Sequence, residues 1–277
     1  VLVNDFGTLP IDADLIEAQS GNLISIAGGC ICCSFGSDLM GALMELAKRE
    51  PAPDHVLLET SGVAMPGVVA RSAALLPAFS IDSVVVLADA ETVRARAADR
   101  YMGDTITRQL QEADLVVLNK ADLVDTTELD ALRHWMVQVA PRAALVEAVR
   151  ASVPTAILFG HGHVPVGTGA LSSGALQPLE AAETRYASAS FSPQSPVDVG
   201  MLARSLARPE CGLVRAKGVL RDRDGSLKTL HLVGTRFEVT PYAGPGDAAT
   251  GLACIGLRQR FSHDAIQSAL GSAAPQP

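Results

Sequence analysis

Short apolar runs alternate with segments of helical periodicity along the first part of this chain, and this alternation limits the possible folds more than any other feature. The runs are typical of buried parallel strands, and the segments between them of crossover helices. The alternation therefore predicts an α/β fold with a doubly wound, mostly parallel sheet, whose functional loops lie at the carboxyl ends of the strands. The predicted strands are Val1–Asn4, Leu23–Ala27, His55–Leu58, Ser83–Ala88, Leu115–Leu118 and Ala143–Val149. The predicted helices are Asp38–Lys48, Pro66–Leu75, Glu91–Tyr101, Asp104–Glu112 and Thr127–Val139.

The pattern changes at Gly160. The stretch Gly160–Gly174 is rich in Gly, Ser and Ala and contains two histidines, His161 and His163, which favours a solvated linker over a metal-binding tract. We predict an α/β domain over residues 1–159, a linker over 160–184 and a smaller α+β domain over 185–277. The elements predicted for the last part are strands over Leu213–Leu220, Leu227–Thr240 and Leu252–Leu257, a hairpin turn at Asp222–Gly225 and a helix over His263–Leu270.

Composition narrows the class of partner. The formal net charge of −8 argues against nucleic acid, and no apolar run approaches the roughly 18 residues of a membrane span. Five cysteines, three of them clustered, fit a reducing compartment with a metal or reactive site rather than a disulfide framework. We therefore expect a cytoplasmic protein with neither a nucleic-acid nor a membrane partner. Cys211 and Cys254 are expected to be structural, and His231 to be packed or solvated.

The clustered cysteines are Cys30, Cys32 and Cys33, which follow Gly28 and Gly29 at the end of a predicted strand. Several soft donors on one short loop suit Zn²⁺, Co²⁺ or Cu⁺. Neighbouring thiols rarely pair with each other, because disulfide geometry needs converging Cβ atoms. Two alternatives remain open: cysteines packed as small hydrophobic side chains, and a redox-sensing thiol cluster. The glycine-flanked setting favours a metal site.

The sequence Asn119-Lys120-Ala121-Asp122 follows the apolar run Leu115–Leu118. At the end of a parallel strand, this motif is the guanine-reading element of GTPases. The carboxylate of Asp122 only accepts hydrogen bonds, and guanine offers two donors, N1–H and the exocyclic amine, at matching spacing. Lys120 can lie over the base with its aliphatic stem, and Asn119 can tie neighbouring loops together. The alternative is a polar loop in which Asp122 caps the next helix.

A third polar motif, Glu59-Thr60-Ser61-Gly62, also follows an apolar run. In a nucleotide-binding sheet, an acid at the position of Glu59 can hold Mg²⁺ directly or through water. Gly62 would allow its backbone N–H to approach the terminal phosphate. The alternative is that Thr60 or Ser61 only caps the following helix.

Together these motifs resemble the CobW-type P-loop GTPases, relatives of the nickel-enzyme maturation GTPases UreG and HypB. The resemblance covers most of the chain, and the pair of cysteine and guanine-reading motifs is its most specific part. It implies metal ligands at Cys30, Cys32, Cys33 and Asp5, a catalytic Glu59, and GTP contacts from Gly62, Asn119, Lys120 and Asp122. The matching segments are Asn4–Gly7, Ile11–Ile16, Gly29–Cys33, Glu59–Gly62, Asn119–Asp122 and Val214–Gly218.

The chain departs from the family pattern at two points. The family opens with a strand and a GxxGxGK[ST] phosphate loop, whereas Val1-Leu2-Val3 resembles the family's second strand. We therefore expect a chain without an N-terminal segment of about thirty residues, the length of one βαβ step, and with weak GTP binding and hydrolysis. In addition, Asp5 stands where the family has glutamate, and Thr8 where an acid is usual.

The resemblance predicts a GTP-dependent metallochaperone or metal insertase. It would bind Zn²⁺ or Co²⁺ through its cysteines, with Cys32 as the first choice of ligand, and use GTP and Mg²⁺ to control transfer to a client metalloprotein. The alternative prediction is a non-catalytic metal-binding or interaction protein that has lost nucleotide hydrolysis.

Overall fold

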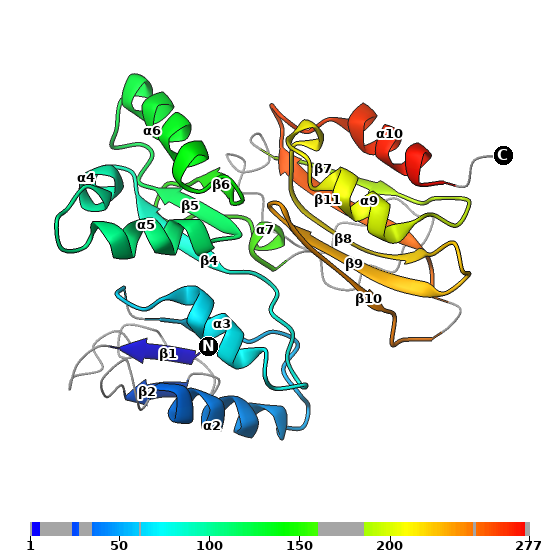
Figure 1. Ribbon diagram of the computed structural model, residues 1–277, viewed down its shortest axis with the longest axis horizontal. Helices are drawn as coiled ribbons and strands as arrows, with labels where there is room; N and C mark the ends of the chain where they lie inside the picture. The colour runs from blue at the N-terminus through cyan, green and yellow to red at the C-terminus, as the bar shows by residue number, and fades with distance from the viewer. Residues whose placement is uncertain are drawn as a thin grey trace.

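The computed structural model describes residues 2–5, 24–27, 35–60, 62–159, 186–245 and 248–274. In these residues the strands form two three-stranded parallel sheets and one five-stranded antiparallel sheet (Figure 1). Figure 1 shows the two parallel sheets on one side of the molecule and the antiparallel sheet on the other. None of the described helices is both long enough and apolar enough to cross a membrane.

The first parallel sheet has the order β2-β1-β3, with β1 (Leu2–Asp5) paired to β2 (Ile24–Ala27) and to β3 (Leu58–Glu59). Two helices, α2 (Phe35–Ala47) and α3 (Pro66–Ala73), pack with it. Their buried residues form one core because they recur at helical spacing and so share one face of each helix. These residues are Leu39, Leu43, Leu46, Val69 and Ala73.

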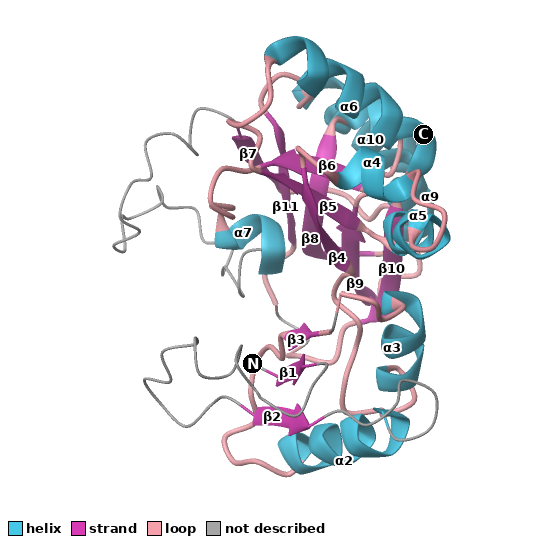
Figure 2. Cartoon of the chain, turned by 90° about the vertical axis from the view of Figure 1, so that its left-hand side faces the viewer, coloured by secondary structure: helices cyan, strands magenta, loops and turns pink. Residues whose placement is uncertain are grey.

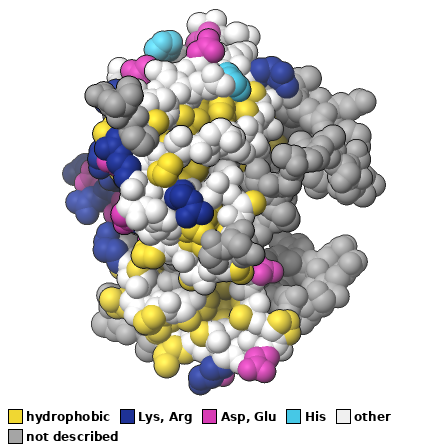
Figure 3. Space-filling model, turned by 90° about the vertical axis from the view of Figure 1, so that its right-hand side faces the viewer, with side chains coloured by type: hydrophobic (Ala, Val, Ile, Leu, Met, Phe, Trp, Pro, Cys, Tyr) yellow, Lys and Arg dark blue, Asp and Glu magenta, His cyan; other side chains and the backbone are white. Residues whose placement is uncertain are grey.

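The outer surface of this layer remains partly apolar. Figure 3 shows hydrophobic side chains over the lower part of one face, where α2 and α3 lie. Val68 of α3 and Leu75, which follows it, are 51% and 76% exposed. Part of the apolar surface of α3 is therefore in contact with solvent in this structure.

The second parallel sheet has the order β4-β5-β6. Its central strand is completely buried at its four apolar residues, because both faces are covered. Val116 and Leu118 contact the helical layer, whereas Leu115 and Val117 contact α7 and the antiparallel sheet. The strands are β4 (Val85–Asp89), β5 (Leu115–Asn119) and β6 (Ala144–Glu147), and the helices are α4 (Val93–Ala97), α5 (Gly103–Glu112), α6 (Thr126–Val139) and α7 (Thr155–Phe159).

The antiparallel sheet has the order β10-β9-β8-β11-β7. One face carries two helices, and the other packs against the second parallel sheet (Figure 2). Val214, Val233 and Ile255 share a buried cluster with Leu115 and Val117 of β5, so the two sheets have a common core. The elements are β7 (Tyr186–Phe191), α9 (Val199–Leu206), the 3-10 turn η1 (Pro209–Cys211), β8 (Leu213–Arg221), β9 (Leu227–Val233), β10 (Arg236–Pro241), β11 (Gly251–Leu257) and α10 (His263–Ala273).

The predicted fold class is confirmed: parallel α/β layers are followed by a smaller α+β unit. The parallel strands lie in two sheets, since β3 and β4 do not pair in the described part of the chain. The prediction of one strand over Leu227–Thr240 was wrong, because Gly234 adopts a φ of 57° and turns the chain between β9 and β10.

The prediction of a helix over Glu91–Tyr101 was too long. The helix ends at Ala97, and the carboxylate of Asp99 then accepts hydrogen bonds from the N–H groups of Tyr101 and Met102. Such a turn offers the backbone partners outside the helix, which ends it. Strand β7 and helices α7 and α9 were not predicted.

Candidate functional site

The carboxyl ends of β4 and β5 bring a cluster of polar side chains together. Asp89, the last residue of β4, lies directly beside Asn119, the last residue of β5. Lys120 follows with a φ of 60°, and its ammonium group donates a hydrogen bond of 2.7 Å to the carboxylate of Asp89. This hydrogen bond lowers the pKa of Asp89 and raises the pKa of Lys120. The two groups are therefore charged at neutral pH, and the lysine stem is held over the strand ends.

Asn119 connects three strand-end loops. Its side-chain Oδ1 accepts a hydrogen bond of 2.8 Å from the N–H of Ala151, in the loop after β6. Its carbonyl accepts one of 2.9 Å from the N–H of Ala90, in the loop after β4. The loop after β6 has positive φ angles at Arg150 (51°) and Ala151 (54°), a conformation that this hydrogen bond helps to hold. The loops around the predicted base-reading motif are thus tied to one another.

Asp122 is exposed in the turn that follows Lys120, and no hydrogen bond of its side chain is found within the described residues. It does not cap the next helix. That position belongs to Asp125, whose carboxylate accepts a hydrogen bond of 2.9 Å from the N–H of Glu128. The helix-cap alternative for Asp122 is therefore wrong, and its carboxylate is available to a ligand.

Glu59 ends β3 and is exposed, as is Gly62 in the turn that follows. The alternative role of Thr60 or Ser61 as a helix cap is wrong, because the N-cap position of α3 is occupied by Met65. As the last residue of β3, Glu59 lies at the carboxyl end of a parallel strand, where acids in nucleotide-binding sheets hold a cation.

Helix α5 holds this turn in place. The side-chain amide of Gln109 donates hydrogen bonds of 2.9 Å to the carbonyls of both Gly62 and Ala64. The N–H of Gly67 donates one of 2.8 Å to the carboxylate of Glu112. A Cβ at Gly67 would lie 2.8 Å from that carboxyl group, so only glycine allows this approach without a shift of Glu112. These contacts join the first parallel sheet to the second.

The predicted cysteine ligands Cys30, Cys32 and Cys33 lie outside the described residues, and of Asp5 only the backbone is described. Asp5 is paired with Ala27 at the ends of β1 and β2, so Asp5 lies beside the last residue of β2, three positions before Cys30 in the sequence. In the described parts of the chain, no group of three or more His, Cys, Asp or Glu side chains is placed to hold a metal ion.

Three residues of this region were not predicted from the sequence: Asp89, Gln109 and Glu112. Asp89 follows an apolar run in the same way as Glu59 and Asn119, so the same signal could have identified it. Gln109 and Glu112 lie on a helix, and their contacts are with residues 45 or more positions away. No local sequence pattern predicts contacts between residues so far apart in the chain.

Comparison with known proteins gives two family matches. Residues 1–147 match the family described as "CobW/HypB/UreG, nucleotide-binding domain". Residues 186–274 match the family described as "Cobalamin synthesis protein cobW C-terminal domain".

Individual relatives carry zinc in their names. The chain is 32% identical over 203 residues to the "Zinc chaperone CobW" of Sinorhizobium sp, covering 61% of this chain and 55% of the relative. It is 27% identical over 169 residues to the "Zinc chaperone YjiA" of Escherichia coli (57% and 51% covered), and 26% identical over 157 residues to the "Zinc-regulated GTPase metalloprotein activator 1" of Schizosaccharomyces pombe (53% and 38% covered). The chain therefore spans about half the length of the relatives it matches, or less.

Among solved structures, the Zn(II)-bound YjiA GTPase from E. coli aligns with 91% of this chain and 80% of its own. The TM-score is 0.41 and the sequence identity is 17%.

Proposed function

Because this chain belongs to the family of CobW, HypB and UreG proteins, we propose that it acts in a GTP-controlled metallochaperone that carries Zn²⁺ to a client metalloprotein. The observation that carries this proposal is the cluster at the ends of β4 and β5. Lys120 is held by Asp89, Asn119 ties the surrounding loops, and Asp122 is left exposed with a free carboxylate. This arrangement is suited to reading a guanine base.

Recognition of guanine follows from hydrogen-bond chemistry. The carboxylate of Asp122 accepts from N1–H and from the exocyclic amine, and adenine offers no equivalent pair of donors. A site built around this carboxylate rejects adenine, because the carboxylate would lose its partners on binding. The stem of Lys120 supplies an apolar surface for one face of the base.

In this proposal, the residues at and after the end of β3 contact the phosphates and Mg²⁺. Glu59 is an exposed carboxylate, a donor type that suits Mg²⁺, and Gly62 leaves its backbone N–H accessible to a phosphate oxygen. Bound Mg²⁺ neutralises charge on the phosphates and so favours hydrolysis by a positioned water molecule. Within this scheme Glu59 orients the cation or the water, and the Gln109 contacts hold the turn that carries Gly62.

Zinc is the cargo in this proposal. Cys30, Cys32 and Cys33 supply thiolates, which bind Zn²⁺ strongly, and Asp5 stands at the end of the neighbouring strand. Co²⁺ suits the same donors, so it remains a second candidate metal. Nucleotide contacts that order the loops after β1 and β3 would close the metal site, and hydrolysis would release that order.

The proposed division of labour follows the predicted domains. Residues 1–159 carry nucleotide and metal, 160–184 form a linker, and 185–277 form a domain that faces the client. We place this activity in the cytoplasm, where reduced thiolates are maintained.

The proposal is tested by titrating the purified chain with Co²⁺, with and without Mg²⁺ and GTP. Tetrahedral thiolate coordination gives intense d–d bands and a thiolate charge-transfer band. Bands that strengthen with GTP support a nucleotide-coupled metal site. The same bands without a response to GTP favour the non-catalytic metal-binding protein. The absence of a thiolate band would overturn the metal assignment.

A further inference from the structure

The segment from Ile81 to Val84 joins the two parallel sheets. The side chain of Ile81 packs against the core formed by α2 and α3. Three residues later, the N–H of Val84 donates a hydrogen bond of 2.8 Å to the carboxylate of Asp114, and its carbonyl accepts bonds from Asp114 and Leu115 at the start of β5. One end of the segment thus belongs to the first parallel sheet and the other to the second.

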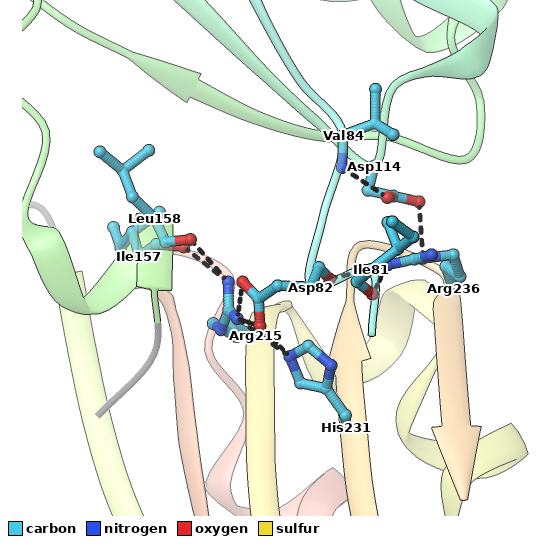
Figure 4. Close-up of polar contacts among 9 residues, drawn as sticks. All are labelled: Ile81, Asp82, Val84, Asp114, Ile157, Leu158, Arg215, His231 and Arg236. Atoms are coloured by element: carbon cyan, nitrogen blue, oxygen red, sulfur yellow. Dashed lines mark hydrogen bonds and ion pairs between the residues drawn. The ribbon is translucent and has the colours of Figure 1, made fainter. Parts of the chain in front are cut away.

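Arg215 of the antiparallel sheet binds the middle of this segment (Figure 4). The side chain of Arg215 is 1% exposed, and its guanidinium donates to the carboxylate of Asp82. It also donates to the carbonyls of Ile157 and Leu158 in α7, at 3.3 and 2.9 Å. A buried guanidinium needs such partners, because an uncompensated charge in this place is strongly destabilising.

His231 completes the contact from β9. Its Nε2 lies 2.9 Å from a terminal nitrogen of Arg215 and 3.2 Å from the carboxylate of Asp82. Burial lowers the pKa of His231 to about 4, so the ring is neutral at neutral pH and its Nε2 accepts a hydrogen bond from Arg215. The imidazole thereby fixes the orientation of the guanidinium.

A second arginine of the same sheet holds the backbone of the segment. Arg236, at the start of β10, donates hydrogen bonds of 3.0 and 2.7 Å to the carbonyls of Ile81 and Asp82. Its Nε lies 3.1 Å from the carboxylate of Asp114, which also binds Val84. Figure 4 shows Arg215 of β8 and Arg236 of β10, on either side of β9, pointing toward the segment.

The turn between β9 and β10 anchors this side of the antiparallel sheet to the second parallel sheet. A Cβ on Gly234 would lie 2.6 Å from the carbonyl oxygen of Asp114, so only glycine allows the turn to approach the amino end of β5 this closely. Thr235 donates to the carbonyl of Arg142 from both its N–H and its hydroxyl, at 3.1 and 3.0 Å. These contacts of Gly234 and Thr235 fix the backbone position of the neighbouring Arg236.

The first parallel sheet has fewer ties. In the described part of the chain β3 does not pair with β4. Within the described residues, the polar contacts that cross between the two parallel layers run from Gln109 of α5 to the carbonyls of Gly62 and Ala64, and from Glu112 of α5 to the N–H of Gly67 in α3. The position of Glu59 relative to Asn119 hence depends on these contacts, on the ring contact between His55, ahead of β3, and Phe159 of α7 (5.7 Å between centroids), and on the segment 81–84.

We propose that Arg215 and Arg236 clamp Ile81–Asp82 so that the antiparallel sheet sets the positions of Glu59 and Gly62 relative to Asn119–Asp122. Release of the clamp frees the first parallel sheet to move about the segment. A ligand that contacts both parallel sheets would sense that change. This last consequence rests on the proposed function, whereas the clamp itself does not.

The experiment measures backbone hydrogen exchange in the full chain without nucleotide, so its outcome does not depend on whether the chain binds GTP. The variant Arg215→Gln removes the charge that holds Asp82. We expect amides of residues 62–69, which include the Gly67 N–H bonded to Glu112, to exchange about tenfold faster than in the parent chain, as for the loss of one charge-assisted pair.

The matched control is Arg133→Gln. Arg133 makes a two-pronged contact with Glu147 that lies entirely within the second parallel sheet and α6. The Arg133→Gln variant should leave the exchange rates of the amides of residues 62–69 unchanged. If Arg215→Gln alters exchange only at 81–84, or affects 62–69 no more than Arg133→Gln does, the clamp is a local contact and the proposal is overturned.

A second variant, Asp82→Asn, tests the clamp independently in case Arg215→Gln does not fold. Asp82→Asn changes a side chain that is 29% exposed and leaves Arg215 bonded to Ile157 and Leu158. Faster exchange at 62–69 in this variant supports the clamp even if Arg215→Gln does not fold. Exchange that matches the parent chain there contradicts it.

Discussion

The ammonium group of Lys120 lies 2.7 Å from the carboxylate of Asp89, across the ends of two adjacent parallel strands. The pair is exposed, with 46% and 31% of the two side chains accessible, so it contributes little to stability. Its effect is on position: it limits the rotamers of a lysine whose own backbone has a positive φ. In the proposed function, a lysine held in this way covers one face of the guanine base.

Replacing Asp89 by Asn should therefore weaken guanine-nucleotide binding without unfolding the chain. We expect a loss of about threefold to tenfold in affinity for a fluorescent GDP analogue, because the stem of Lys120 must then be ordered on binding. The thermal midpoint should not change. The matched control is Glu45→Gln, which breaks an exposed lysine–carboxylate pair of 2.8 Å on α2, far from the strand ends. An equal loss of affinity in both variants would contradict the positioning role of Asp89.

Asp122 and Asp125 should behave in opposite ways, although they are three positions apart. Asp122→Ala is expected to reduce guanine-nucleotide affinity at least about tenfold, because two charge-assisted hydrogen bonds are lost, and to leave stability unchanged. Asp125→Ala removes the N-cap of α6 and should cost about 1 kcal/mol of unfolding free energy with affinity retained. Calorimetric titration with GDP and urea unfolding of each variant separate the two effects. If Asp125→Ala lost the affinity instead, the base-reading assignment would be wrong.

The sequence predicted local features well, since they are encoded in neighbouring residues. The four apolar residues of β5 identified a strand with both faces buried, and the polar residues after it identified the loop where Asn119 and Lys120 meet Asp89. The sequence did not predict contacts between distant residues. Asp82 and Arg215 are 133 positions apart, and neither has neighbours that distinguish it from an ordinary surface charge.

The prediction of one strand over Leu227–Thr240 failed because one residue within it changes the backbone direction. Gly234 lies within a run of strand-forming residues, and its positive φ splits that run into β9 and β10. The reason for the turn is tertiary: the turn must approach the carbonyl of Asp114 closely. A single glycine inside an apolar run does not reveal such a requirement.

The proposed function predicts that Cys32 and Cys254 differ in metal binding. Cys32→Ala should abolish tight Zn²⁺ binding and leave the fold intact. The control Cys254→Ala should retain it, because burial raises the pKa of Cys254 to about 12 and keeps that thiol protonated at neutral pH. Competition with a chromophoric chelator measures both affinities, and circular dichroism checks the fold. Unchanged affinity in Cys32→Ala would remove that residue from the proposed ligand set.

Acidification should weaken the folded state through His231. Its folded pKa is lowered to about 4, against 6.5 when unfolded, mainly by burial. Between these values the unfolded chain binds more protons, so the stabilising contribution is complete above pH 6.5 and is lost as the pH falls toward 4. In His231→Gln this part of the pH dependence, ~1–3 kcal/mol, should disappear, because glutamine can accept from Arg215 but cannot take up a proton. Urea unfolding at pH 7, 6 and 5 measures the difference between variant and parent chain. The exposed His134→Gln serves as control, and parallel pH curves for His231→Gln and the parent chain would contradict the assignment.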